Sequence, residues 1–343
     1  MSGGVQIGRG VHFIRLPLPF APRLPSVNAY VFSGNEGLTV LDVGVGSEEG
    51  YRILVEGLEE LGPGLAGLRR VIGSHLHVDH MGLASRLVAE TGCKFLMHTN
   101  AIDDVPAYND WSIIRSWVSK LALLHGAPPD HVETTSIFDF RPDWAPETVP
   151  PTPTVSDGDR IPLEPGRWLE VVHTPGHEQA HICLLDSATG ILYSGDHVLP
   201  RITPFIPYLD DLDTLGSYLS SLDRVVQIDP TLTYPAHGGL IERGAARARQ
   251  IALHHERRLG AMLEVVRKRP ATAWEVMSAV FRPNLGPVDS RLAFQETMAH
   301  LEYLRLRGRL EQVEQDGVLA YRQPPWRHSS PPPRGQAGRA END

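Results

Sequence analysis

The chain has few cysteines and no long apolar run. Only Cys93 and Cys183 occur in 343 residues, and each lies in or beside an expected strand, so we expect buried thiols rather than a disulfide framework. No apolar stretch approaches the roughly 20 residues that a membrane-spanning helix needs, so we expect no membrane contact. Residues 1–5 lack a basic segment followed by an apolar one, so a secretory signal is not expected. The cytoplasm is the expected location.

An excess of positive charge is also missing. The chain has 32 Lys and Arg against 41 Asp and Glu, a formal net charge of −9, which argues against a surface that coats nucleic acid. The charge is uneven, because residues 247–323 carry 13 basic against 9 acidic side chains while residues 1–246 carry a net −14. The acidic part is the part that holds the candidate catalytic residues.

Histidine and aspartate are concentrated in residues 74–82, which read Ser-His-Leu-His-Val-Asp-His-Met-Gly after an apolar, β-branched run. Imidazole and carboxylate are ligands that zinc accepts, and a site that keeps one position open for water is catalytic rather than structural. Alternation from the strand end would turn His75 and His77 to one side and leave Asp79 and His80 near a second position. This one segment could therefore serve two metal ions.

Three further candidate ligands, His177, Asp196 and His237, lie downstream, and each follows a run typical of a strand. Loops at strand ends that each deliver a ligand indicate one site at one rim of a sheet. A chance cluster on a polar loop is the alternative for any single histidine, because the chain holds 16. Chance does not account for the whole set.

The order His-x-His-x-Asp-His, then His, then Asp, then His resembles the metallo-β-lactamase superfamily over about residues 10–245. With the expected half-sheets and outer helices, the resemblance implies an α+β fold, a four-layer αβ/βα sandwich in a catalytic domain at residues 1–246. The expected cofactors are two Zn²⁺ ions, with Mn²⁺ or Fe²⁺ as alternatives. The resemblance assigns His75, His77 and His177 to the first ion, Asp79, His80 and His237 to the second, and Asp196 as the bridge between them.

Two segments lie outside this pattern. Residues of about 100–153 form an insertion expected to frame the pocket mouth. Residues 247–323 read as three helices and a β-hairpin, with a capping box at 272–275, which is the order of a winged helix. The resemblance therefore narrows to lactamase-beta-2-like and glyoxalase II-like hydrolases, and we expect this domain to pack beside the mouth rather than bind DNA. Residues 324–343 are rich in Pro, Gly, Ser and Arg and are expected to be disordered.

Two metal ions would lower the pKa of a shared water to about 7, so that a bridging hydroxide can attack at neutral pH. Asp79 is a candidate catalytic residue that binds metal and accepts a hydrogen bond from this hydroxide. His181 is a candidate for contacting the substrate or protonating the leaving group, with a structural hydrogen-bonding role as its alternative. Asp42, where the resembling family also has an aspartate, is expected to fix a ligand imidazole or loop, with a turn or helix cap as the alternative.

The ligand identities narrow the chemistry. Lactamases of the superfamily tend to have Cys or Ser in place of Asp196, which disfavours antibiotic hydrolysis. The flavodiiron oxidoreductases have Glu in place of His77, which disfavours redox chemistry. The first hypothesis is hydrolysis of a small acyl thioester or ester, such as an acyl-CoA, acyl-carrier or glutathione thioester, or a lactone. It is motivated by the acidic body, which would repel polyanions, and by the tryptophan-bearing insertion.

Two other hypotheses stay open. An endoribonuclease or phosphodiesterase acting on single-stranded RNA is suggested by the C-terminal domain and its local positive charge. A non-catalytic nucleic-acid-binding regulator, built on a degenerate hydrolase body, is the hypothesis from another class. The favoured partner is therefore a small-molecule acyl substrate, with nucleic acid second, and a homodimer is left open.

Overall fold

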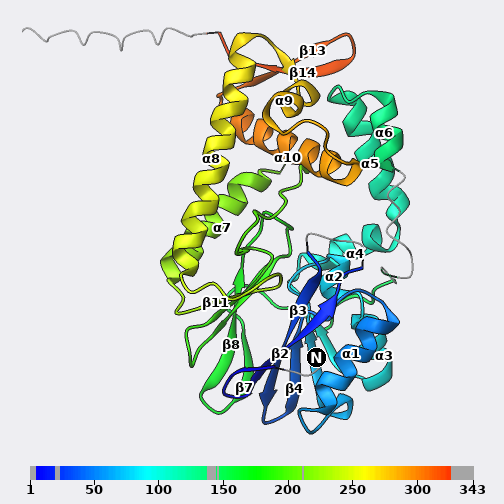
Figure 1. Ribbon diagram of the computed structural model, residues 1–343, viewed down its shortest axis with the longest axis vertical. Helices are drawn as coiled ribbons and strands as arrows, with labels where there is room; N and C mark the ends of the chain where they lie inside the picture. The colour runs from blue at the N-terminus through cyan, green and yellow to red at the C-terminus, as the bar shows by residue number, and fades with distance from the viewer. Residues whose placement is uncertain (1–4, 20–23, 137–143, 145–146, 211, 326–343) are drawn as a thin grey trace, which may run out of the picture.

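The computed structural model describes residues 5–19, 24–136, 144, 147–210 and 212–325. Most of the tail that is expected to be disordered lies outside these residues. Figure 1 shows two large sheets in the lower half of the molecule, with helices and a small third sheet above them. The long helix α8 (Gly244–Lys268) runs along one side of the molecule and extends from the lower half into the upper half. No helix in the described ranges combines the length and the apolar character that crossing a bilayer requires.

The first sheet contains six strands in the order β1-β2-β3-β4-β5-β6. Strands β1 to β4 are antiparallel neighbours, whereas β4, β5 and β6 are parallel, as expected when helices connect them. Helix α1 (Glu48–Glu59) begins after Ser47, whose hydroxyl accepts a hydrogen bond from the Gly50 N–H at 3.0 Å. Helix α3 (Ala84–Thr91) ends before Gly92, whose φ of 68° suits a helix C-terminus. The strands are β1 (Val5–Gly8), β2 (Val11–Pro17), β3 (Ser26–Gly34), β4 (Gly37–Leu41), β5 (Leu68–Ile72) and β6 (Lys94–Leu96).

The second sheet contains five strands in the order β11-β10-β9-β8-β7. Its strands are antiparallel except for the outer pair β10 and β11, which are parallel and connected through helix α7 (Thr214–Ile228). The strands are β7 (Arg160–Glu164), β8 (Arg167–His173), β9 (Ile182–Asp186), β10 (Leu192–Gly195) and β11 (Thr233–Pro235).

The two sheets pack face to face over buried apolar side chains such as Phe32, Val171 and Tyr193. A second cluster lies between the first sheet and the helices α1 and α3, and a third joins the second sheet to α7 and α8. Helices therefore cover the outer face of both sheets (Figure 1). This is the predicted α+β fold, a four-layer αβ/βα sandwich.

The insertion forms three helices, α4 (Ala101–Asn109), α5 (Trp111–Leu124) and α6 (Pro129–Ser136). The C-terminal part contains α8, α9 (Ala273–Val280) and α10 (Pro287–Leu306), with a sheet of order β12-β14-β13. Helix α6 packs against both α5 and α10. The insertion and the C-terminal part therefore form one upper layer. The small strands are β12 (Ala271–Thr272), β13 (Glu311–Gln315) and β14 (Val318–Arg322).

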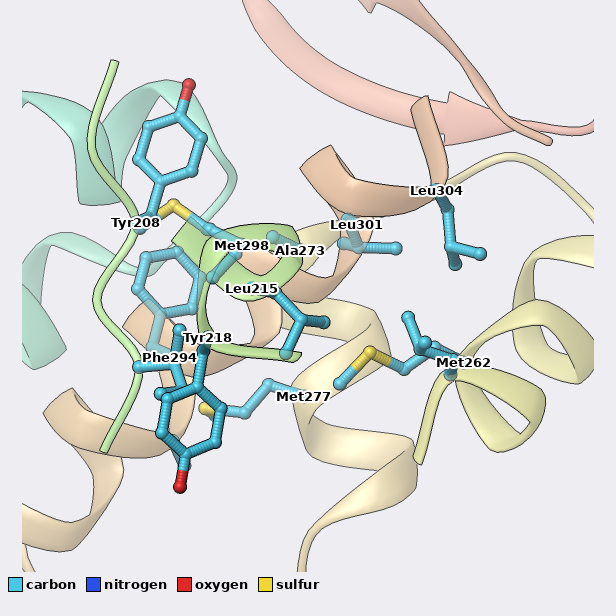
Figure 2. Close-up of a cluster of buried hydrophobic side chains, with 14 of the residues drawn as sticks. Tyr208, Leu215, Tyr218, Met262, Ala273, Met277, Phe294, Met298, Leu301 and Leu304 are labelled. Carbon is cyan, nitrogen blue, oxygen red and sulfur yellow. The ribbon is translucent and has the colours of Figure 1, made fainter. Parts of the chain in front are cut away.

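A continuous apolar core joins this upper layer to the sandwich. Figure 2 shows Phe294 and Met298 of α10 beside Tyr208, Leu215 and Tyr218 of the lower half. Leu215, Tyr218 and Met298 are each 0% exposed. Burial of side chains of this size contributes roughly 1.5–3 kcal/mol each, so the C-terminal part is held against α7 and the preceding loop.

The capping box predicted at the start of α9 is present. The Thr272 hydroxyl accepts from the Glu275 N–H at 3.2 Å, and the Glu275 carboxylate accepts from the Thr272 N–H at 2.9 Å. We expect Thr272→Ala to lower the free energy of unfolding by about 1 kcal/mol, because a helix N–H loses its acceptor. Urea unfolding measures this loss. Ser278→Ala in the same helix removes a hydroxyl that, among the described residues, bonds only the Trp274 carbonyl. It should change the stability by less than about 0.5 kcal/mol, and an equal loss in both variants would count against the cap.

Candidate metal centre

Four chain segments bring polar side chains to one edge of the two sheets. Strand β5 leads into a segment that carries His75, His77, Asp79 and His80. This segment includes the short helix α2 (Val78–Met81). The segments after β8, β10 and β11 carry the three remaining predicted ligands. The structure thus brings all seven predicted ligand side chains together, His75, His77, Asp79, His80, His177, Asp196 and His237.

Three imidazole nitrogens form the first group. The His77 Nδ1 lies 2.9 Å from the His75 Nε2 and 3.1 Å from the His177 Nε2. Zinc binds imidazole nitrogens at roughly 2.0 Å in tetrahedral sites, which separates neighbouring ligand atoms by about 3.3 Å. The three nitrogens therefore have the spacing of ligands around one ion.

Asp79, His80 and His237 form the second group. The Asp79 Oδ2 lies 3.3 Å from the His237 Nε2 and 3.7 Å from the His80 Nε2. The Asp79 side chain is 16% exposed, whereas the side chains of His80 and His237 are at most 2% exposed. Asp79 is therefore the member of this group that reaches toward solvent.

Asp196 lies between the two groups. Its Oδ2 lies 3.8 Å from the His177 Nε2 of the first group and 3.6 Å from the His80 Nε2 of the second, and its Oδ1 lies 3.3 Å from the His237 Nε2 of the second. A carboxylate within 3.8 Å of imidazole nitrogens of both groups is placed as a bridging ligand would be.

The inner atoms of the site fit a cation. The His80 Nε2, the His237 Nε2 and the Asp196 Oδ1 are buried and make no hydrogen bond of acceptable geometry with the residues that the structure describes. Buried polar atoms without a partner are costly, and all three are atoms that bind divalent metals. The donor set of nitrogen and carboxylate oxygen suits zinc or a similar first-row ion.

The outer nitrogens of four rings are held by acceptors of the protein, so that each Nε2 keeps its lone pair toward the centre. The His177 Nδ1 donates to the Phe205 carbonyl at 2.6 Å and the His237 Nδ1 to the Ser26 carbonyl at 2.8 Å. The other two rings contact side chains. The His80 Nδ1 donates to Asp42 at 2.9 Å, and the His75 Nδ1 lies 3.0 Å from the Ser74 hydroxyl.

The pKa shifts of the side chains differ between the two ligand groups. Burial, followed by the neighbouring His80, lowers the pKa of His75, while burial and His177 lower the pKa of His77 to about 3. Both rings are therefore neutral, as metal ligands must be. Burial would raise the pKa of Asp79, but His80 and His237 outweigh it and bring the pKa to about 2.

His237 shows the opposite shift. Burial would lower its pKa, but the carboxylates of Asp196 and Asp79 raise it to about 9. Without metal, a proton on this ring balances the two buried carboxylates. A divalent cation would supply the same compensation, with the ring in its neutral form.

The structure gives His181 a different place from the predicted contact with substrate. The ring is 0% exposed, its Nε2 accepts from the Asp196 backbone N–H at 3.1 Å, and its Nδ1 lies 2.8 Å from the Thr174 hydroxyl. Burial, then the neighbouring His197, lowers its pKa well below the ordinary value. Both nitrogens are used within the protein, so His181 supports the Asp196 loop from behind.

A further His and Glu group, His255, Glu296 and His300, lies between α8 and α10. The His255 Nδ1 is 3.0 Å from the His300 Nε2, and the His300 Nδ1 donates to the Glu296 carbonyl at 2.6 Å. Burial lowers the pKa of His255 to about 2 and of His300 to about 3, which keeps both rings neutral. The Glu296 carboxylate pairs with Arg258, so its charge is already balanced and we assign this group to packing rather than to metal.

Asn28 and Tyr30 of β3 support the His237 loop from the first sheet. This role was not predicted from the sequence. A signal was present, because Asn28 is a single amide side chain within a run of apolar and aromatic residues. Strand interiors disfavour asparagine, so its presence in a buried strand indicates a specific hydrogen-bonding need.

A family model described as the metallo-beta-lactamase superfamily matches residues 22–237, and one described as metallo-beta-lactamase-like, C-terminal domain, matches residues 259–324. The chain is 29% identical to the probable metallo-hydrolase YqjP of Bacillus subtilis (strain 168), over 85% of this chain and 91% of that protein. It is 25% identical to the lactamase-like protein aptB of Emericella nidulans, over 79% of this chain and 73% of that protein.

Solved structures show the same fold. A metallo-beta-lactamase family protein from Thermus thermophilus matches with a TM-score of 0.78 and 27% identity, over 93% of this chain and 100% of the other. A beta-lactamase domain protein from Burkholderia ambifaria matches with a TM-score of 0.77 and 26% identity, over 94% of each chain. With its cluster of His and Asp side chains that could hold divalent metal, the chain belongs to the metallo-β-lactamase superfamily.

Proposed function

We propose that this protein is a binuclear zinc-dependent hydrolase that cleaves a thioester or ester of a small acyl group. The observation that carries the proposal is the position of Asp196, whose carboxylate lies within 3.8 Å of imidazole nitrogens of both ligand groups. A non-catalytic regulator would be built on a degenerate hydrolase body. Such a body is not expected to keep all seven ligand side chains. Mn²⁺ and Fe²⁺ suit the same donors and are the alternatives to zinc.

Bound metal ions would make a water molecule acidic and polarise the oxygen of the substrate under attack. The chain's own residues hold and orient the reactants. Asp79 is ionised and reaches toward solvent, so it can accept a hydrogen bond from the attacking water. Cys93 and Cys183 are free and buried, burial raises the pKa of both thiols, and neither belongs to the site, so neither is assigned as a nucleophile.

We propose that residues 244–322 form a winged helix that does not read DNA. The order of three helices with the sheet β12-β14-β13 supports the winged helix. In DNA-binding relatives of this motif the third helix enters the major groove. Here that helix is α10, which packs against α6, α7, α8 and α9, with residues 293–302 all buried. We therefore propose that the domain shapes access to the metal centre, with an acyl substrate as the partner.

The net charge of −14 over residues 1–246 also favours a small acyl substrate over RNA, because an acidic body repels a polyanion. The free cysteines are compatible with the cytoplasmic location that the sequence predicts.

We propose that the substrate carries an anionic group that pairs with Arg291, a partly buried arginine in the upper layer. Arg291 of α10 makes no ion pair or hydrogen bond with any part of the chain that the structure describes. Burial, then the like charge of Arg115 on α5, lowers the pKa of Arg291. A guanidinium in such a place gains from an anionic partner. A carboxylate or phosphate of the substrate would supply it.

We expect Arg291→Gln to raise the KM for an acyl-CoA by about tenfold or more, because a hydrogen bond to a charged group contributes roughly 1.5–3 kcal/mol. The KM for a neutral ester such as p-nitrophenyl acetate should not change. Arg282→Gln, which breaks an exposed pair with Asp289 in the same domain, is the matched control. An equal change for both substrates would exclude a specific anion contact.

The proposed activity is tested with acyl-CoA, acyl-glutathione, a lactone and single-stranded RNA, each with zinc-loaded protein and after chelation. We expect turnover of at least one thioester or ester, lost on chelation and restored by zinc. Metal-dependent cleavage of RNA without any thioester or ester turnover would replace the proposal with the nuclease alternative. RNA binding without turnover of any substrate class would favour the regulator.

A further inference from the structure

The loop that carries His237 is held by its own sheet on one side only, where the Ala236 N–H donates to the Gly195 carbonyl at 2.9 Å. Strand β11 has three residues and lies at the outer edge of the second sheet, where it pairs with β10. On its other side the described residues make only an isolated bridge from Thr233 to Ile241. Gly238, directly after the ligand, has a φ of 83°, a conformation that glycine adopts readily but with no side chain to pack. A ligand at such a position needs to be held from elsewhere.

Strand β3 of the opposite sheet holds this loop. The Asn28 N–H donates to the Ala236 carbonyl at 2.7 Å, and its Nδ2 donates to the carbonyls of Pro235 and Gly238 at 3.0 Å each. The Tyr30 hydroxyl donates to the same Pro235 carbonyl at 2.7 Å. Asn28 alone thus makes three hydrogen bonds to the chain on both sides of His237, and it is 3% exposed.

Alternation along β3 explains why these contacts occur together. The side chains of Asn28 and Tyr30 project from one face of the strand, and the backbone N–H of Asn28 and the carbonyl of Ser26 both contact the His237 segment. Ser26 contributes its carbonyl, which accepts from the His237 Nδ1 at 2.8 Å. The same stretch of β3 therefore orients the ligand ring and holds the backbone on either side of it.

The amide of Asn28 is used as a donor. Both carbonyls that face its Nδ2 can only accept, so the amide orientation is determined by its partners. Its Oδ1 is buried and has no hydrogen-bond partner within the described ranges, which costs stability. An aspartate has the same shape but would place a carboxylate against two carbonyl oxygens.

We infer that Asn28 is a positioning residue for the second ligand group, and that it acts by holding the His237 loop against the first sheet. The inference rests on the proposed metal centre. His237 belongs to the group of Asp79 and His80. Asn28 makes no hydrogen bond to His75, His77 or His177 among the described residues, so the first group does not depend on it.

Asn28→Asp in the full-length protein tests this selectivity. Metal-free protein is titrated with Zn²⁺ against a chromophoric chelator, and bound metal is counted by mass spectrometry. Wild-type protein is expected to bind two ions. In Asn28→Asp one ion should keep its wild-type Kd, while the other binds at least about tenfold more weakly, since loss of a group that orients a ligand costs 10–100-fold in affinity. Tyr30→Phe removes the hydrogen bond to the Pro235 carbonyl and the one that the Tyr30 hydroxyl accepts from the Asn28 Nδ2, but keeps Asn28 itself, so it should show a smaller shift of the same ion.

Val31→Ala is the control for general destabilisation. Val31 is a buried neighbour in β3 that faces the helix-side core, so its truncation should lower the melting temperature without changing either Kd. Two unchanged ions in Asn28→Asp, or equal weakening of both, would overturn the inference. If Asn28→Asp does not fold, Asn28→Ser is measured instead, and unchanged binding of both ions there would overturn it equally. A wild-type protein that binds no metal would remove the proposed function itself, which is a distinguishable result.

Discussion

Asp196→Asn is expected to release one of two bound metal ions and to lower kcat/KM by at least about 10³-fold. The substitution keeps the shape of the side chain but removes the charge that faces His177 and His237. Loss of metal-ion stabilisation costs several kcal/mol at the transition state, and about 4 kcal/mol corresponds to 10³-fold in rate. Metal content by mass spectrometry and steady-state kinetics on the best substrate of the panel measure the two effects together.

The matched control is Asp213→Asn, which changes a half-buried aspartate that caps α7 and pairs with Arg307. It should leave the metal count and kcat/KM unchanged. If Asp196→Asn keeps both ions at wild-type affinity, the bridging position assigned to this carboxylate is wrong. If metal is lost while activity persists, the proposed reaction does not use this centre.

Asp42→Ala is expected to destabilise the protein by about 3–5 kcal/mol and to weaken metal binding by 10–100-fold. The carboxylate is 1% exposed. One oxygen accepts from the Ser74 N–H at 2.8 Å, and the other accepts from the Ser74 hydroxyl at 3.0 Å and the His80 Nδ1 at 2.9 Å. Breaking a buried charged contact costs about 3–5 kcal/mol, and loss of a group behind a metal ligand costs 10–100-fold in affinity.

Urea unfolding of metal-free protein measures the stability, and zinc competition measures the affinity. Asp42→Asn is the conservative comparison, because it keeps the volume and one acceptor oxygen, and it should lie between wild type and Asp42→Ala in both measurements. A stability loss without any change in zinc affinity would make Asp42 a turn residue only, which is the alternative that the sequence also allowed.

The position of the ligands was predictable because they follow strands. A strand that ends at the rim of a sheet leads into a loop at that rim, so His177, Asp196 and His237 meet wherever β8, β10 and β11 share one sheet. Side-chain alternation from the end of the strand was expected to orient His75 and His77, but the structure shows a different cause. Strand β5 ends at Ile72, so alternation does not orient these rings. Hydrogen bonds of Asp42 to Ser74 fix the start of this segment instead.

The place of His181 could not be predicted from its sequence neighbours. Four residues after His177, it was a plausible contact for substrate. The left-handed Gly195, with a φ of 50°, lets the chain at Asp196 pass directly against the His181 ring. The Asp196 N–H can therefore donate a hydrogen bond to the His181 Nε2. Such a contact between separate strands depends on the tertiary structure.

The local pattern by itself determined the helices, the strands and the identity of the candidate metal ligands, because periodicity, caps and ligand chemistry act over a few neighbouring residues. The tertiary structure decided which surfaces these elements share. Packing against α7 buries α10, the helix that a DNA-binding domain would expose. It also places Asn28 of one sheet against the His237 loop of the other. Both outcomes depend on contacts between residues far apart in the chain, and no short-range pattern encodes them.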